Sequence, residues 1–163
     1  MRHVISILLQ NESGALARVA VMFATRGFNI ESLNVAPTED AAVSSLTLVT
    51  TGTEDVINQI NKQLAKLIDV VAIADRTTTD HIERELGVVK LRVEAGGAES
   101  LEGFLAAHGA LVLESDDEHV TIQVTGDERE VDSFLEEIPP GVALLAVIRS
   151  GPLVTARGAP SLT

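Results

Sequence analysis

The sequence predicts an α+β protein built from two tandem ferredoxin-like βαββαβ units, residues 1–75 and 82–163, joined by a linker at residues 76–81. Short apolar segments rich in β-branched residues alternate with segments of helical periodicity in the order strand, helix, strand, strand, helix, strand. The same order returns after a polar, nonperiodic stretch at residues 75–80, which is typical of a domain boundary. In each unit, two helices are expected on one face of a four-stranded antiparallel sheet.

The first unit begins with a buried strand and a helix that a polar corner joins. Residues 3–9 are aliphatic and β-branched, whereas Leu16, Val19, Ala20 and Phe23 recur at helical spacing. The other elements expected in this unit are strands at residues 30–36, 43–50 and 70–74, a turn at 37–40, and a helix that begins near Thr53.

The second unit repeats this order without repeating the sequence. Asp127 is a good N-cap, and Glu130 stands at capping-box spacing, so the last helix is expected to begin there. The other expected elements are a strand at residues 85–94, a helix from Gly97 to Gly109, strands at 110–114 and 119–125, and a final strand at 142–148.

The corner between the first strand and the first helix is the candidate binding site. Gly14 has no side chain, so the first N–H groups of the helix, those of Gly14, Ala15 and Leu16, are expected to be open to a small anion. Asn11 precedes this helix and Asn29 follows it, so two asparagines bracket the helix. The alternative is that the polar residues of the corner only cap the helix and that the glycine only eases the turn.

Composition and charge narrow the class of protein. The formal net charge of −12 argues against nucleic acid as a partner, because proteins that bind it concentrate Lys and Arg on one face. The sequence has no apolar run long enough for a transmembrane helix and no export signal at its N-terminus, so we expect no membrane partner and a cytoplasmic location. With no cysteine, the chain has no disulfide and no thiolate nucleophile.

The residue types present do not support a catalytic function. The four histidines are scattered, and only His81 and Glu85 have the i,i+4 spacing of a pair on one helix. A metal site needs three or four ligands, so this pair is a weak candidate. Ser13 and Ser32 have no evident base to activate them. We therefore expect no catalytic residue, no metal site and no cofactor on this chain.

The residues of the corner also carry a resemblance to a known family. The sequences NESGALARV at residues 11–19 and RGFNIESL at residues 26–33 resemble the opening motif of the ACT domain in the regulatory subunit of acetohydroxyacid (acetolactate) synthase. Residues 62–70, 83–86 and 148–158 resemble later parts of the same family. The resemblance therefore makes residues 1–75 an ACT effector-binding domain, and it extends over nearly the whole chain.

The resemblance implies a non-catalytic regulatory subunit of acetolactate synthase, acting in branched-chain amino acid biosynthesis. Such a subunit activates a separate catalytic large subunit, which holds thiamine diphosphate, FAD and Mg, and confers feedback inhibition by valine. ACT domains similar to this one associate side by side as homodimers. Valine or a related branched-chain amino acid would then lie in a pocket shared between two chains and lined by Asn11, Gly14, Ala15, Leu16, Asn29 and Ile30.

A second function class remains open from the sequence. An amino-acid-responsive transcription regulator of ACT type would use the same kind of effector domain. The absence of a basic DNA-binding segment disfavours this alternative.

Overall fold

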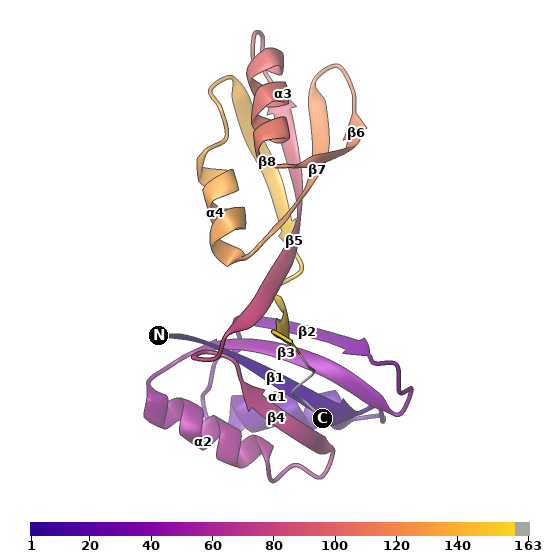
Figure 1. The fold of residues 1–163 in the computed structure, drawn as a ribbon, viewed down its shortest axis with the longest axis vertical. Helices are drawn as coiled ribbons and strands as arrows, with labels where there is room; N and C mark the ends of the chain where they lie inside the picture. The colour runs from indigo at the N-terminus through magenta and orange to yellow at the C-terminus, as the bar shows by residue number, and fades with distance from the viewer. Residues whose placement is uncertain (159–163) are drawn as a thin grey trace. The chain divides into compact units, whose positions relative to one another are not determined.

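The computed structural model describes residues 1–158 and divides the chain into two compact units. The first comprises residues 1–82 together with the C-terminal residues from Leu153 onward, and the second comprises residues 83–152. Each unit has a sheet and two helices in βαββαβ order, which confirms the predicted α+β fold (Figure 1).

The first unit is a four-stranded antiparallel sheet in the order β2-β3-β1-β4. Because β3 lies between β1 and β2, and β1 lies between β3 and β4, each helix connects two strands across a third one. Its elements are β1 (Arg2–Gln10), α1 (Ala15–Thr25), β2 (Ser32–Pro37), β3 (Val43–Thr51), α2 (Glu54–Leu64) and β4 (Val70–Asp75).

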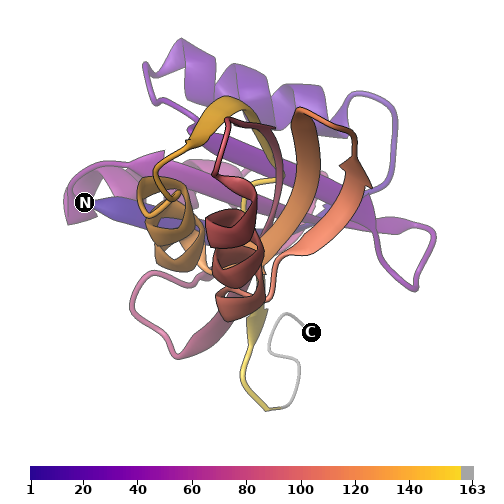
Figure 2. The same cartoon turned by 90° about the horizontal axis from the view of Figure 1, so that it is seen from above.

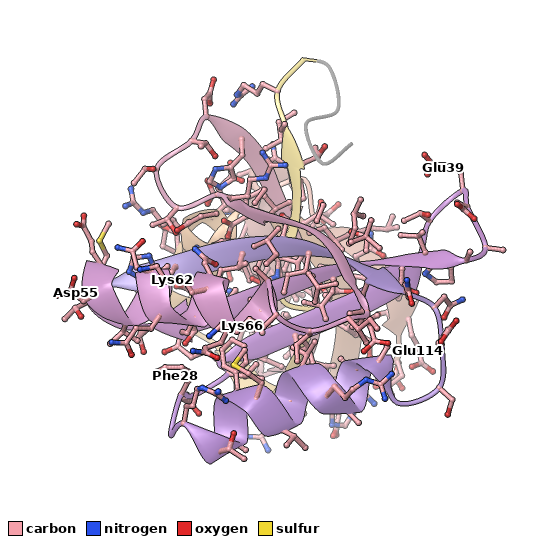
Figure 3. The ribbon with its side chains drawn as sticks, turned by 90° about the horizontal axis from the view of Figure 1, so that it is seen from below. Phe28, Glu39, Asp55, Lys62, Lys66 and Glu114 are labelled. Carbon is pink, nitrogen blue, oxygen red and sulfur yellow. The ribbon has the colours of Figure 1, made fainter. Side chains whose placement is uncertain are left out.

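The core of the first unit lies between the sheet and its two helices. Ile5 pairs with Leu48 and Ile7 with Leu46 across β1 and β3, and all four side chains are completely buried. Figure 3 shows α1 and α2 side by side over this face of the sheet. The helices contribute Ala15, Val19, Met22, Phe23, Ile57, Ile60 and Leu64 to the same core.

The second unit has the strand order β6-β7-β5-β8, and these neighbours pair antiparallel. A further strand, β9, pairs with β5 and was not predicted from the sequence. The elements are β5 (His81–Val93), α3 (Ala98–Ala107), β6 (Leu111–Ser115), β7 (His119–Gly126), α4 (Glu128–Glu136) and β8 (Val142–Arg149), whereas β9 (Leu153–Ala156) belongs to the first unit.

Both helices of the second unit pack on one core, and Figure 2 shows them next to each other. Phe104 of α3 and Phe134 of α4 stack with ring centroids 4.8 Å apart. The predicted N-terminus of α4 is confirmed. The Asp127 side chain accepts a hydrogen bond from the Glu130 N–H, and the Glu130 side chain accepts one from the Asp127 N–H.

Strand β5 begins at His81, four residues before the expected start at Glu85. Residues 81–84 gave no strand signal, because three of the four are charged or ionisable. Glu85 is accommodated in the strand by Arg149 of β8, whose Nη2 donates to Glu85 Oε2 at 2.7 Å. The Glu85 side chain is only 4% exposed, so this ion pair compensates a carboxylate that burial would otherwise destabilise.

The compact units differ from the predicted domain boundaries at two places. The sequence predicts a linker at residues 76–81 and assigns everything from residue 82 to the second domain, whereas the first unit includes residues 76–82 and those from Leu153. Arg157 Nε donates to Asp80 Oδ1 at 2.9 Å, so the predicted linker is in contact with the residue that follows β9. No helix among the described residues is long and apolar enough to cross a membrane.

Candidate effector-binding site

The corner between β1 and α1 has the backbone shape that the glycine was expected to allow. Gly14 is the residue that caps α1, and its φ of 86° and ψ of −9° place it in the left-handed region, which glycine adopts without steric cost. No side chain caps the helix. Asn11 instead uses its Nδ2 to donate to the carbonyl oxygen of Ala41 at 3.0 Å. The alternative interpretation of the corner, a side-chain N-cap, is therefore not what the structure contains.

Two of the three N–H groups expected to be open are open. Among the described residues, the N–H groups of Gly14 and Leu16 have no hydrogen-bond partner, whereas Ala15 N–H donates to Glu12 O at 3.2 Å. The expectation for Ala15 is wrong because the loop closes a turn onto that amide. Its side chain is also 2% exposed and belongs to the core. Gly14 and Leu16 thus leave two donors at the positive end of the α1 dipole.

Asn29 and Ile30 lie beyond the other end of α1. The carbonyl oxygen of Asn29 accepts a hydrogen bond from Thr50 Oγ1 at 2.6 Å, which fixes the backbone, while the residue stays exposed. Ile30 is half-buried and packs against the core. Since α1 has 11 residues, its two ends are about 16 Å apart. One chain therefore does not bring Asn11 and Asn29 together.

Arg18 is a neighbour of this corner that sequence reasoning missed. Its Nη2 donates to Asp69 Oδ1 at 2.8 Å, and the Asp69 side chain is 4% exposed against 46% for Arg18. A Cβ built on Gly14 would lie 3.0 Å from Arg18 Nη1, so the guanidinium lies beside the glycine. No sequence pattern links two residues 51 positions apart, although Arg18 follows Gly14 by one helical turn.

The ion pair shifts both titrations in the direction of the charged forms. The hydrogen bond from Arg18 lowers the pKa of the Asp69 carboxyl below its ordinary value, and the bond to Asp69 raises the pKa of Arg18. Asp69 also accepts a backbone hydrogen bond from Gln10 N–H through its carbonyl oxygen at 2.8 Å. The pair therefore connects the end of β1, the first turns of α1 and the loop before β4.

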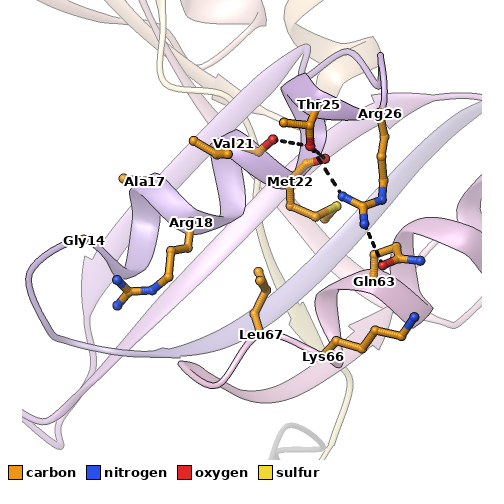
Figure 4. A pocket seen from close by; sticks show the side chains of 10 residues that line it. All are labelled: Gly14, Ala17, Arg18, Val21, Met22, Thr25, Arg26, Gln63, Lys66 and Leu67. Carbon is orange, nitrogen blue, oxygen red and sulfur yellow. Dashed lines mark hydrogen bonds between the residues drawn. The ribbon is translucent and has the colours of Figure 1, made fainter.

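A groove of about 580 Å³ runs between α1 and the end of α2 with the residues that follow it, and we call it the α1–α2 groove (Figure 4). Its walls include Gly14, Arg18, Val21, Arg26, Lys66 and Leu67. Arg26 Nη2 donates to Gln63 Oε1 at 3.0 Å across one end of it. Of the predicted site residues, only Gly14 belongs to this groove. The groove is thus a feature that the sequence did not predict.

The described residues hold no group of three or more metal-ligating side chains. His81 and Glu85 lie on strand β5, so the helical pairing considered for them is wrong. Glu85 is engaged by Arg149, and His81 Nδ1 lies 2.7 Å from the carbonyl oxygen of Thr79. The corner between β1 and α1, with its free backbone N–H groups and a guanidinium beside them, is better suited to binding an anion than to catalysis.

Comparison with known proteins places this geometry in a family. Residues 5–72 match the model of an AHAS small subunit-like ACT domain, and residues 84–158 match that of the small subunit of acetolactate synthase. The acetolactate synthase isozyme 3 small subunit of Escherichia coli (strain K12) is 39% identical over 158 residues, which cover 97% of either chain. The chain belongs to the acetolactate synthase small-subunit family.

Two further comparisons support membership in the acetolactate synthase small-subunit family. The acetolactate synthase small subunit of Haemophilus influenzae is 37% identical, and the alignment covers 97% of each chain. The crystal structure of the acetolactate synthase small subunit from Thermotoga maritima superposes with a TM-score of 0.87 at 27% identity, covering 98% of this chain and 99% of that one. The family resemblance noted from the sequence motifs is therefore confirmed.

Proposed function

We propose that this chain is the regulatory subunit of an acetolactate synthase: a cytoplasmic chain without synthase activity that activates a separate catalytic subunit and makes it sensitive to valine. The match over 97% of the chain to small subunits of acetolactate synthase carries this proposal. In it, thiamine diphosphate, FAD and Mg belong to the catalytic subunit. This chain contributes the effector site and a docking surface.

The pocket for the effector is assigned to a homodimer formed through the first unit. Strand β2 is an edge of its sheet, and an unpaired edge can join a second copy. Leu33 and Val35 are paired with the core residues Leu48 and Leu46, yet remain 37% and 38% exposed because β2 is at the edge of the sheet and has a neighbouring strand on one side only. A second copy would cover this open rim of the core.

Symmetry then explains why the candidate residues lie at opposite ends of α1. In a two-fold dimer the same patch meets itself, so paired β2 strands run antiparallel and so do the two copies of α1. The N-terminal end of one α1, with Asn11 and Gly14, would then stand beside the Asn29 end of the other. Residues about 16 Å apart in one chain become neighbours across the interface.

A branched-chain amino acid matches the chemistry of such a pocket. Its carboxylate would accept from the free N–H groups of Gly14 and Leu16 at the positive end of the α1 dipole. Its ammonium would donate to the side-chain oxygen of Asn29, and its apolar side chain would contact Ile30 and Val35. Valine is the effector we propose, with leucine and isoleucine as the related candidates.

A transcription regulator of ACT type is less well supported. The net charge of −12 opposes association with a polyanion, and the chain's matches to the small-subunit family extend through both units.

The proposed function is tested by reconstitution with the purified catalytic subunit. The isolated chain should form no acetolactate, adding it should raise the turnover of the catalytic subunit, and valine should then lower that turnover. A catalytic subunit whose turnover is the same with and without the chain would contradict activation. Activation that valine, leucine and isoleucine all leave unchanged would contradict the effector assignment alone.

A further inference from the structure

The solvent-facing side of α1 is unusually apolar for a helix on a surface. Five of its seven exposed residues are apolar and include a leucine and a valine, whereas the exposed residues of α2 and α4 are all polar or charged and the exposed apolar residues of α3 are only alanines and a glycine. Val21 is 58% exposed and Leu16 is 39% exposed. A helix that is apolar on its outer side is normally buried against another element, so α1 is expected to be covered in an assembly.

The outer residues of α1 fall on two different sides of the helix. Leu16, Ala20 and Ala24 recur at i,i+4 and form one side, which the proposed dimer can cover. Val21 lies on another side and lines the α1–α2 groove, together with Met22 and Leu67. Ile68, which follows Leu67 in the chain, is 87% exposed. The dimer therefore leaves a second apolar surface uncovered.

The α1–α2 groove is positively charged, although the chain as a whole is negatively charged. Arg18, Arg26 and Lys66 line it, and no Asp or Glu does, although the chain has 24 acidic and 12 basic residues. In the described part of the chain, Lys66 has no ion-pair partner, and Arg26 pairs with the neutral Gln63. Only Arg18 is neutralised, by Asp69.

The positive charge of the groove limits which partner could bind in it. A second copy of the chain that placed its own groove here would bring Arg26 and Lys66 against the same cations, and like charges at an interface are unfavourable. The groove follows α1 from Gly14 to Thr25, about 16 Å or three helical turns. A helix that lays an apolar face between two helices, with carboxylates at its edges, fits both the length and the charge.

We propose that the α1–α2 groove is the docking site for an acidic amphipathic helix of the catalytic subunit. This inference rests on the proposed function, because it specifies where on the regulatory chain the catalytic partner binds. Apolar side chains of that helix cover Val21, Met22 and Leu67, and its carboxylates pair with Arg26 and Lys66. The effector site and this docking site then share the N-terminal end of α1, where Gly14 lines both, and lie on different sides of the helix beyond it.

The test compares matched variants of the full chain for binding to the purified catalytic subunit. Lys66→Glu reverses a charge in the groove, and Lys62→Glu makes the same change one turn earlier on α2, outside it (Figure 3). Val21→Ser removes the apolar centre of the groove, and Val71→Ser removes a valine of similar exposure, 55%, on β4. The dissociation constant is measured at two salt concentrations, and circular dichroism checks that each variant is folded.

We expect Lys66→Glu to weaken binding by about tenfold or more and to reduce its salt dependence, because one attraction becomes a repulsion. We expect Val21→Ser to weaken it about fivefold, and both controls to stay within about twofold. Equal binding by groove and control variants overturns the docking site while leaving the proposed function intact. A wild-type chain that does not bind the catalytic subunit overturns both. A groove variant that instead changes the self-association of the isolated chain would overturn the proposal, because it would show that a second copy of the chain binds in the groove.

Discussion

At the scale of single residues, Gly14 is required by the backbone conformation and is also central to the proposed binding site. Its φ is 86°, so any side chain there is strained, and a Cβ would also approach Arg18 Nη1 to 3.0 Å. A side chain at this position would enter the space beside the free N–H groups of residues 14 and 16. The glycine is thus needed both for the turn and for access to the amides.

We expect Gly14→Asp to reduce valine affinity by at least about tenfold, since the new carboxylate would take the free amides that the ligand carboxylate needs and would repel its negative charge. The positive φ should also cost about 1 kcal/mol of folding free energy. Gly109→Asp is the matched control, because Gly109 has a φ of 61° and open space around it. If calorimetry showed wild-type valine affinity for both folded variants, the pocket would have to lie elsewhere on the chain.

Asn29→Ala tests the opposite end of the proposed pocket without adding charge. Within the described residues, the Asn29 backbone carbonyl accepts from Thr50 Oγ1 and the amide side chain has no partner, so loss of that side chain should leave the thermal stability nearly unchanged. Valine affinity should fall by about tenfold or more, the effect of one lost hydrogen bond to a charged group. Unchanged affinity in a folded variant would remove Asn29 from the site.

Asp69 gives a prediction about acid stability. Arg18 lowers the pKa of Asp69 in the folded chain below the ordinary 3.8, so the pair stabilises the fold fully above about pH 4 and loses its contribution as the pH falls toward the folded pKa. The melting temperatures of the wild type and of Asp69→Asn should therefore differ between pH 5 and 8. That difference should shrink below about pH 4; a difference independent of pH would show that the ion pair does not stabilise the fold.

At the scale of elements, the sequence predicted best where a local pattern decides the structure. The short apolar run of β1 and the periodicity of α1 are local, and so is the capping box that starts α4, and these were recognised correctly. Features that depend on distant residues were missed. They include the ion pair of Glu85 with Arg149, which is 64 residues away, and that of Arg18 with Asp69. Tertiary partners of this kind leave no local pattern.

The close approach of two glycines in the second unit is another contact that sequence spacing does not reveal. Gly97, which precedes α3, lies against the backbone of Gly141, so a Cβ there would overlap the Gly141 carbonyl. We expect Gly97→Ala to destabilise the protein by about 2 kcal/mol through overpacking. Gly103→Ala, at an open position inside α3, should instead stabilise it by about 0.5–1 kcal/mol. Denaturant unfolding of both variants measures the difference, and equal effects would contradict the contact.

At the scale of the whole molecule, one chain supplies only part of the proposed effector site. Gly14 and Asn29 stand at opposite ends of α1, and β2 leaves the rim of the core open at Leu33 and Val35. Assembly would complete the pocket and cover this rim together. Effector binding and dimerisation must then be thermodynamically linked, because a ligand that binds only the dimer stabilises it by mass action.

We therefore predict that the isolated chain is a dimer at micromolar concentration and that valine strengthens the dimer. Val35→Lys should weaken it, because a lysine on the edge strand opposes pairing with a second copy and buries a charge at the interface. Val71→Lys is the control, since β4 is the other edge of the same sheet and Val71 is 55% exposed. Sedimentation equilibrium with and without valine measures the dissociation constants. If Val71→Lys dissociates the dimer while Val35→Lys does not, the chains pair through β4, and the residues that complete the valine site must be sought at that edge.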